Sequence, residues 1–445
     1  MENLLAHMDQ VSFLGVRALG YGALVQFTWI YDRPVNLDQL RRFHENLGYG
    51  LLGRRVERSP LPFARDRWVS CRGPRDVDVA ATSRARAEVN AWAYERACLP
   101  IDPERGPSWH LGVLPLTDGG SAVCLTASHT VVDGLGFLQA IADAVHGRRH
   151  HFGYPLPGSR TRRRGMVEDG RLTIASAPQL AHALAATGRV VRSRRRDVRA
   201  SFASGRTSRR AGGPDHPVVV PSVTAYIDLV DWDARANSLG GNSHTLLAGF
   251  AARLGVRAGR VCADGAVNLS LPISDRTKDD TRGNAMVLPV ASVDPTGLTA
   301  DLTEVRGKAK LAFSDLSSTS DELLATLPLT SMTPKWLARR TAGVGMGSAQ
   351  LPIGCSNMGD MDPVVNRPDG TDADYAAGRL VEPGITKRVL ERMRGQLFLV
   401  SGRIHGRLWI SLNAYLPGVI TDREELRDAA LRTLDEFDLT AEIHG

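Results

Sequence analysis

The 445-residue sequence has few cysteines and no long apolar run. Its five cysteines form no C-x-x-C pair, which argues against a disulfide framework or a zinc cluster and favours a reducing, cytoplasmic location. No stretch approaches the roughly 18 apolar residues of a membrane-spanning helix, so we expect no transmembrane segment. The first residues lack a basic stretch followed by an apolar run, and we therefore expect no signal peptide.

Lysine is absent from the most basic part of the chain, residues 148–210. This segment holds 16 arginines and three acids (Glu168, Asp169 and Asp197), hence a balance of +13, which leaves −6 for the rest of a chain whose net charge is +7. An excess of positive charge attracts anionic partners. The uneven distribution restricts that expectation to one segment.

The length exceeds what a single hydrophobic core usually supports, so two domains are expected. Strand-like and helix-like patterns alternate in both halves, which indicates an α+β fold. We place an N-terminal lobe at residues 1–175, an arginine-rich connection at 176–215 and a C-terminal lobe at 216–445. Within the stretch 148–215 the sequence predicts one helix, at 177–191.

Turn residues and apolar periodicity predict the main elements. Asn36 is expected to cap a helix, and Thr421 with Glu424 has the spacing of a capping box. The interval 352–385 is predicted to be irregular. The expected strands are 23–30, 111–116, 121–128, 224–229, 266–272, 286–293, 395–404 and 408–414. One expected helix begins at Leu37, and the others cover 85–98, 135–145, 243–255, parts of 301–345 and 422–438.

One segment combines residues suited to catalysis: S-H-T-V-V-D-G, residues 128–134, between a predicted strand and a predicted helix. A histidine at the end of a strand is held rigidly, and imidazole exchanges protons near neutral pH, so His129 is a candidate general base. Asp133 can brace the turn by pairing with an arginine, and Gly134 lets the chain turn sharply into the helix. The plainer interpretation is a core histidine beside a helix-capping aspartate, but the whole pattern favours catalysis.

The pattern His129-x-x-x-Asp133-Gly134 resembles the H-x-x-x-D-G motif of the chloramphenicol acetyltransferase/condensation-domain superfamily. That superfamily includes nonribosomal peptide condensation domains, wax ester synthase/diacylglycerol acyltransferases and polyketide-associated acyltransferases. Other segments resemble motifs of its lipid acyltransferase branch in the same order, so the resemblance covers most of the chain. These segments are His7-Met8-Asp9 with Phe13, Gly106-Pro107-Ser108-Trp109, Leu271-Pro272-Ile273-Ser274-Asp275-Arg276, Gly283-Asn284, Val287-Leu288-Pro289 and Cys355-Ser356-Asn357-Met358-Gly359.

The sequence also departs from the family patterns. Ser128 stands where the motif often has a first histidine, whereas the second, catalytic histidine matches His129. Ser243-His244 occupies the place of an Asn-Asp pair that is common in the lipid branch, which weakens a wax-ester or triacylglycerol interpretation. The D-F-G-W-G motif of the plant branch is absent, and no adenylation or carrier module is attached, so we expect a stand-alone enzyme.

The resemblance implies two chloramphenicol-acetyltransferase-like lobes that meet in a V, with His129 midway along an interlobe tunnel. An acyl thioester, on coenzyme A or on the phosphopantetheine of a carrier protein, enters from one mouth, and a small-molecule alcohol or amine enters from the other. His129 deprotonates this acceptor, and Arg276 is expected to pair with Asp133. Gly134 or a second-lobe side chain stabilises the oxyanion. No permanently bound cofactor and no metal ion are expected.

Several further residues are candidates for the substrate path, each with a plainer alternative. Met8, Phe13 and Trp109 suit either a tunnel or a core, and the segment 7–9 suits tying down the N-terminus. His244 is a second ionisable group in the cleft or a capping residue. The remaining tunnel candidates are Ser128, Arg276, Asn284, Ser356 and Asn357, of which Ser356-Asn357 also suits a plain turn.

The arginine-rich segment 148–210 has three interpretations. It is a solvated connection, or a docking surface for an acidic acyl carrier protein or the phosphates of coenzyme A. A nucleic-acid arm would have aromatic residues among the arginines. Only Phe152, Tyr154 and Phe202 are present, so we expect no nucleic-acid partner.

Three functions remain open. The leading hypothesis is an acyltransferase of a specialised-metabolite or lipid pathway, with His129 as base. The second is a free-standing peptide-bond-forming condensation enzyme, which would require carrier-bound substrates where the first would accept free coenzyme A thioesters. The third is a non-catalytic binding protein of the same fold, against which the intact His129, Asp133 and Gly134 argue.

Overall fold

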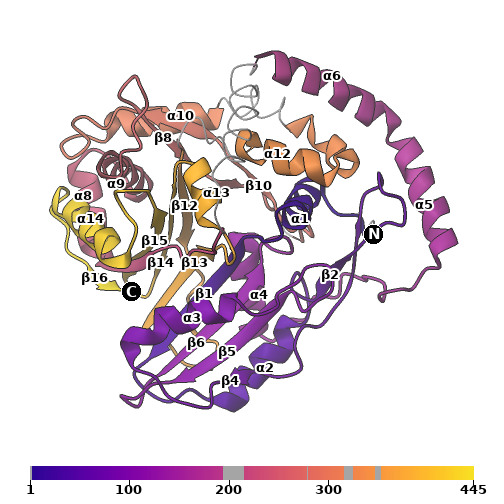
Figure 1. Cartoon of the computed structure of the whole chain (residues 1–445). Coiled ribbons are helices and arrows are strands. Elements are labelled where there is room, and N and C mark those ends of the chain that lie inside the picture. Colours follow the sequence, from indigo (N-terminus) through magenta and orange to yellow (C-terminus); the bar gives the residue numbers. More distant parts are fainter. Residues whose placement is uncertain (1–2, 194–214, 278, 315–323, 346–351) are drawn as a thin grey trace.

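Figure 1 shows a computed structural model in which two β-sheets are covered by helices and meet along one side. The structure describes residues 3–193, 215–277, 279–314, 324–345 and 352–445. The part of the arginine-rich segment from 194 to 214, with seven of its 16 arginines, lies outside these residues. The mixed α/β architecture in two lobes agrees with the predicted fold class.

The first half of the chain contains most of the predicted elements, with bounds shifted by one or two residues. They are α1 (His7–Leu19), β1 (Leu24–Tyr31), α2 (Leu37–Leu47), β2 (Arg54–Glu57), β3 (Arg67–Ser70), β4 (Asp78–Val79), the 3₁₀ helix η1 (Arg86–Glu88), α3 (Val89–Ala97), β5 (Trp109–Pro115), β6 (Ser121–Ser128), α4 (Gly134–Val145), α5 (Arg162–Ala175) and α6 (Ala177–Ser193). The predicted cap of α2 is confirmed, because Asn36 accepts hydrogen bonds from the backbone of Asp38 and Gln39.

Helix α5 was not predicted, because its sequence is mostly polar and shows no clear apolar face. Local interactions stabilise it instead. The hydroxyl of Thr161 caps its N-terminus by accepting from the Arg164 backbone N–H at 3.3 Å, and Arg164 pairs with Glu168 one turn later at 2.6 Å. Together with α6, α5 forms an arc along the outside of the molecule (Figure 1).

The second half contains β7 (Ser222–Asp228), α8 (Leu229–Ser238), α9 (Ser243–Arg257), β8 (Val267–Ser270), β9 (Ile273–Ser274), β10 (Met286–Val287), β11 (Val290–Val293), α10 (Thr303–Ser314), η3 (Leu327–Met332), α12 (Lys335–Gly345), β12 (Ile353–Asp360), η5 (Pro363–Asn366), β13 (Tyr375–Val381), α13 (Lys387–Arg392), β14 (Gln396–Ile404), β15 (Arg407–Tyr415), α14 (Arg423–Asp435) and β16 (Glu442–His444).

Three expectations for this half were wrong. The interval 352–385 contains β12 and β13, which were missed because they include residues that are uncommon in strands, such as Gly354. A Cβ there would lie 2.3 Å from the Phe398 ring, so glycine serves close packing between strands. The predicted strand 286–293 is split before Pro289, which has no N–H to donate. The cap of α14 is Asp422 with Glu425, one residue later than predicted.

The first sheet has the strand order β13-β1-β6-β5-β4, and helices cover both of its faces. Side chains of α2 and α4, such as Phe43 and Ile141, pack with Phe27 and Leu125 on one face. On the other face, Trp92 of α3 packs with strand residues that include Cys124. Because both faces are buried, β6 is apolar along most of its length and ends at Ser128 in a fixed position.

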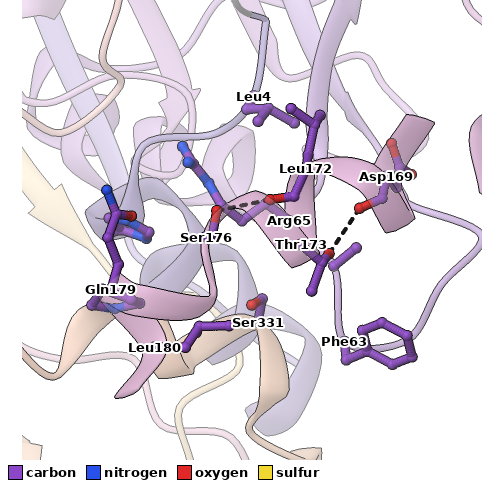
Figure 2. Close-up of a pocket in the computed structure, with 13 residues that line it drawn as sticks. Leu4, Phe63, Arg65, Asp169, Leu172, Thr173, Ser176, Gln179, Leu180 and Ser331 are labelled. Atoms are coloured by element: carbon purple, nitrogen blue, oxygen red, sulfur yellow. Dashed lines mark hydrogen bonds between the residues drawn. The ribbon is translucent and has the colours of Figure 1, made fainter. Parts of the chain in front are cut away.

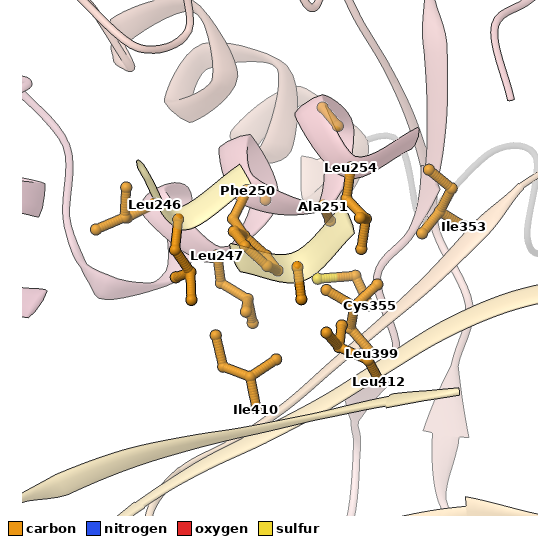
Figure 3. Close-up of a cluster of buried hydrophobic side chains, with 14 of the residues drawn as sticks. Leu246, Leu247, Phe250, Ala251, Leu254, Ile353, Cys355, Leu399, Ile410 and Leu412 are labelled. Carbon is orange, nitrogen blue, oxygen red and sulfur yellow. The ribbon is translucent and has the colours of Figure 1, made fainter. Parts of the chain in front are cut away.

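The second sheet has the order β11-β8-β12-β14-β15-β7-β16 and forms the other large core. Figure 3 shows side chains of α9, among them Leu247, Phe250 and Leu254, against Leu399 and Leu412 of β14 and β15. The two sheets are joined by β13, which belongs to the second half of the sequence but pairs with β1 along its whole length. In the part of the chain that the structure describes, no helix is long and apolar enough to span a membrane.

Candidate functional site

The turn between β6 and α4 carries the residues that the sequence singles out. The backbone N–H of His129 donates to the Ala23 carbonyl at 3.0 Å, which extends the pairing of β6 with β1 by one residue. Asp133 caps α4, since its Oδ1 accepts from the Gly136 N–H at 2.7 Å. Pairing at one end and capping at the other hold the turn in a single conformation.

The backbone freedom predicted for Gly134 is not required at the turn. Gly134 is the first residue of α4 and does not have a positive φ, so the chain needs no special freedom to turn there. Instead, a Cβ at this position would lie 2.8 Å from Cε of Met358 on β12. Glycine thus allows the second lobe to approach the start of α4 closely.

Asn284 fixes the protonation pattern of His129. Its Nδ2 donates to the His129 carbonyl and to Asp9 Oδ1, both at 3.1 Å, and both of these atoms only accept hydrogen bonds. The Asn284 Oδ1 therefore faces Nδ1 of His129, at 2.9 Å, and that nitrogen must donate. In the neutral imidazole the proton is then on Nδ1, and Nε2 carries the lone pair that a general base needs.

Asp9 of α1 holds Asn284 in place. Its two oxygens accept from the backbone N–H groups of Gly283 and Asn284 at 2.9 and 2.7 Å, in addition to the Asn284 side chain. The carboxyl is fully buried; burial raises its pKa, while the charge of Arg54 and these hydrogen bonds act in the opposite direction. Asp9, Asn284 and His129 form a connected chain from α1 to the imidazole.

The pairing of Arg276 with Asp133, which the sequence predicts, is present. Nη2 of Arg276 lies 2.7 Å from Asp133 Oδ2, and the same oxygen accepts from the Ala285 N–H at 2.8 Å. The Asp133 N–H in turn donates to the Gly283 carbonyl at 2.8 Å. The segment 276–285 of the second half is thus bound to the motif through both its side chains and its backbone.

Arg54 is a buried cation that the sequence analysis missed. It donates to the carbonyls of Val131 at 2.8 Å and Thr281 at 2.5 Å, and to the Tyr154 hydroxyl at 2.8 Å. Its guanidinium stacks 4.0 Å from the centre of the Trp68 ring. Arg54 therefore ties the motif to the segment 276–285 a third time. Only its place in the fold reveals this role, because no motif surrounds it in the sequence.

Trp109 and Phe13 are core residues, the alternative that the sequence left open. Trp109 is 0% exposed and its Nε1 donates to the Leu52 carbonyl at 3.1 Å, and Phe13 belongs to the same core. Ser128 is also buried, and its hydroxyl accepts from the Thr130 N–H at 3.3 Å. Ser128 therefore stabilises the turn, and in the described part of the chain no hydrogen bond joins it to the His129 side chain.

Ser356 and Asn357 lie on β12 immediately before Met358, the residue that faces Gly134. Nδ2 of Asn357 and Nδ1 of His244, at the start of α9, are 2.8 Å apart. The structure thereby brings these two candidates together. Among the described residues, no three His, Cys, Asp or Glu side chains are grouped as ligands of a metal ion would be.

A cleft of about 30 Å³ lies between α5, η3 and the N-terminal segment (Figure 2). Two of its polar side chains bond to carbonyls of α5: the Thr173 hydroxyl donates to the Asp169 carbonyl and the Ser176 hydroxyl to that of Leu172. The rest of the lining is mixed, with Phe63 and Leu180 beside His7, Gln179 and Ser331.

No protein-family model matches the sequence, and no curated protein matches it. Solved structures do match in fold. The first condensation domain of the CDA synthetase superposes with a TM-score of 0.57 at 13% identity over 99% of each chain. For wax ester synthase/diacylglycerol acyltransferase from Marinobacter aquaeolei VT8 the TM-score is 0.53 at 15% identity, over 98% of each chain. Polyketide synthase associated protein 5 from Mycobacterium tuberculosis gives 0.52 at 13%, over 98% of this chain and 96% of that one.

All three structures have the chloramphenicol acetyltransferase/condensation-domain fold that the motifs predicted, and each match covers nearly the whole chain. The protein therefore has this two-lobed fold. At these identities the likeness concerns the fold alone, so the activity has to be argued from the site.

Proposed function

We propose that the protein is an acyltransferase that moves an acyl group from a thioester to a hydroxyl or amine of a small molecule, with His129 as the general base. The observation that carries this proposal is the contact of His129 Nδ1 with Asn284 Oδ1 at 2.9 Å. It leaves Nε2 as the nitrogen that can take a proton from an acceptor.

The reaction needs one proton shuttle. Nε2 of His129 removes the acceptor proton while the acceptor oxygen or nitrogen attacks the thioester carbonyl. When the tetrahedral intermediate collapses, the carbon–sulfur bond breaks and the thiolate takes the proton back from Nε2. The products are the ester or amide and the free thiol, and the protein returns to its initial state. No permanently bound cofactor enters these steps, since the thioester is a co-substrate.

Asp133 and Arg276 act as positioning residues in this proposal. Their ion pair is nearly buried, with side-chain exposures of 3% and 11%, and it links the motif to the second-lobe segment that also carries Asn284. A shift of the segment would move the amide away from the imidazole. Correct geometry at a reacting group is worth large factors in rate.

The donor is either an acyl-coenzyme A or an acyl carrier protein. Both are anionic, and α5 presents exposed arginines, including Arg162, Arg163 and Arg171. Such a surface attracts either donor at long range. Salt dependence of the Michaelis constant, and its loss in a variant with these three arginines replaced by glutamine, would support docking on α5. Unchanged kinetics would show that the arginines of α5 are solvated and do not bind the donor.

The proposal is tested by His129→Ala, with His146→Ala as the matched control, because His146 is an exposed residue that ends α4. The purified variants are assayed with a panel of acyl-coenzyme A and carrier-bound donors. Loss of a general base lowers turnover by about 10²- to 10⁴-fold. An unchanged rate in His129→Ala would end the proposal, and activity with carrier-bound donors alone would favour the peptide-condensing alternative.

A further inference from the structure

A polar cavity, separate from the cleft beside α5, lies where β13 crosses β14 and β15. None of the residues of the turn 128–134 lines it. Its volume is about 20 Å³, room for about one water-sized group, and it is lined by the side chains of Ser222, Glu382, Gln396 and Asn413, among others. Four buried polar atoms of these residues, Ser222 Oγ, Glu382 Oε2, Gln396 Oε1 and Asn413 Nδ2, have no hydrogen-bond partner among the described residues. Gln396 and Asn413 are only 4% and 6% exposed.

Unpartnered buried polar atoms are rare, because each costs free energy unless a ligand or water satisfies it. The groups here are mostly acceptors: a carboxylate oxygen, an amide oxygen and a hydroxyl, against one amide donor. Arg379 also lines the cavity, but its three nitrogens donate away from these atoms, to the Gln26 side chain and to the side chain and carbonyl of Asn90. The cavity is therefore suited to a group rich in hydrogen-bond donors.

The strand register relates the cavity to His129: Glu382 of the cavity directly follows β13, His129 directly follows β6, and β1 lies between these two strands. Ser128 lies opposite Leu24, and Leu24 lies opposite Val381. His129 and Glu382 are the next residues along β6 and β13, which run in the same direction. Two spacings between neighbouring strands put their backbones about 10 Å apart.

We infer that this cavity binds a primary ammonium group of the acceptor, with Glu382 as its counter-ion, while a hydroxyl of the same molecule reaches His129. The inference rests on the proposed function. The ammonium supplies three donors and a positive charge, which match the three acceptor atoms and the carboxylate. A coenzyme A or phosphopantetheine arm fits less well, because its phosphates would meet the Glu382 carboxylate.

Burial and charge support this assignment. Burial raises the pKa of Glu382, and a hydrogen bond with Gln396 opposes that shift only in part. A cation in the cavity would stabilise the ionised carboxylate. The inference predicts that ligand binding and ionisation of Glu382 favour each other.

The test uses 8-aminooctan-1-ol and octan-1-ol, because an eight-carbon chain spans about 10 Å at roughly 1.25 Å per bond along its axis. Calorimetric titration of the wild-type protein is expected to show at least about tenfold tighter binding of the amino alcohol. Glu382→Gln should remove this preference. Glu391→Gln, an exposed glutamate on the neighbouring α13, should keep it.

Equal affinity for the two alcohols in the wild type, or a preference that survives in Glu382→Gln, overturns the inference. If Glu382→Gln does not fold by circular dichroism, Ser222→Ala serves instead and should weaken the preference, and an unchanged preference there counts against the cavity.

Turnover is measured separately with an acyl-coenzyme A donor, and the expected product is the ester at the hydroxyl. A binding preference without acyl transfer would refute the proposed function alone. His129-dependent esterification of both alcohols at equal efficiency would refute the cavity alone.

Discussion

Two buried polar clusters, around His129 and around Glu382, lie at the ends of β6 and β13, whose backbones are about 10 Å apart, and they differ in how their hydrogen bonds are used. Around His129, the carboxylates of Asp9 and Asp133 are each bound to backbone N–H groups and to a side chain. Around Glu382, four polar atoms are buried without a partner among the described residues. In the first cluster both carboxylates are paired without a ligand, although Nε of Arg54 and Nε of Arg276 also lack a partner among the described residues, and the cluster holds the turn 128–134. The second cluster is incomplete at its carboxylate, as a site for a polar ligand would be.

Breaking the cluster around His129 is expected to have the largest effect on stability. Arg276→Met leaves the Asp133 carboxylate buried without its cation, which typically costs about 3 kcal/mol. We expect a corresponding drop in the free energy of unfolding in denaturant titrations, together with loss of activity. Replacing Asp133 by Asn in the same chain should recover part of the stability, because the uncompensated charge is gone.

The control for this prediction is Arg367→Met. Arg367 pairs with Asp372 at 3.4 Å, but both side chains are almost half exposed. Such pairs contribute about 0.5 kcal/mol or less. An equal loss in the two single variants would show that burial of the Arg276–Asp133 pair has no special role.

Removal of the amide that contacts His129 should reduce turnover more than stability. We expect Asn284→Ala to lower kcat about 10²-fold while KM changes little, because the imidazole loses the acceptor that keeps its proton on Nδ1. The ¹⁵N chemical shifts of His129 would report a mixture of tautomers instead of one. Asn46→Ala is the control, because it also removes a partly buried side-chain amide, one that donates to the Ala144 carbonyl. It should leave both measurements as in the wild type.

The close approach of the lobes at Gly134 predicts a smaller effect. In Gly134→Ala the new methyl group would meet the end of the flexible Met358 side chain, so we expect stability to change by about 1 kcal/mol or less. The displaced side chain should lower kcat/KM about tenfold. The double variant Gly134→Ala/Met358→Ala should regain most of the activity. A failure to do so would mean that Gly134 acts through its backbone.

The smallest effect concerns pH and the incomplete cluster. Because the pKa of Glu382 is raised in the folded protein, folded molecules bind its proton more tightly than unfolded ones. Its contribution to stability is therefore present at low pH and lost as the pH rises through the folded-state pKa. The stability of the wild type relative to Glu382→Gln should fall as the pH rises above the ordinary pKa of a glutamate, about 4.3.

Denaturant titrations at several pH values measure this difference, and a flat or rising difference would contradict it. The neighbouring groups do not interfere. Burial, with the charge of Glu382, raises the pKa of Tyr21 to about 12, so Tyr21 stays neutral until the pH approaches that value.

The contacts of the site differ in whether they could be predicted from the sequence. The pairing of Asp133 with Arg276 could be expected from the family resemblance, because both residues lie in segments that match motifs of the superfamily. The contact of Asn284 with His129 could not, although Asn284 was a candidate, because it depends on Asp9 orienting the amide. Arg54 gave no local signal, since its partners are carbonyl groups of residues far along the chain.

The sequence by itself determined the fold class, the strand–turn–helix setting of His129 and the capping of α4. These depend on local patterns of apolar residues, turn residues and caps, which act over a few positions. Tertiary structure alone decided the crossing of β13 into the first sheet, the tautomer of His129 and the cavity beside Glu382. Each of these depends on backbone and side-chain atoms brought together from distant parts of the chain, and no local pattern records such distances.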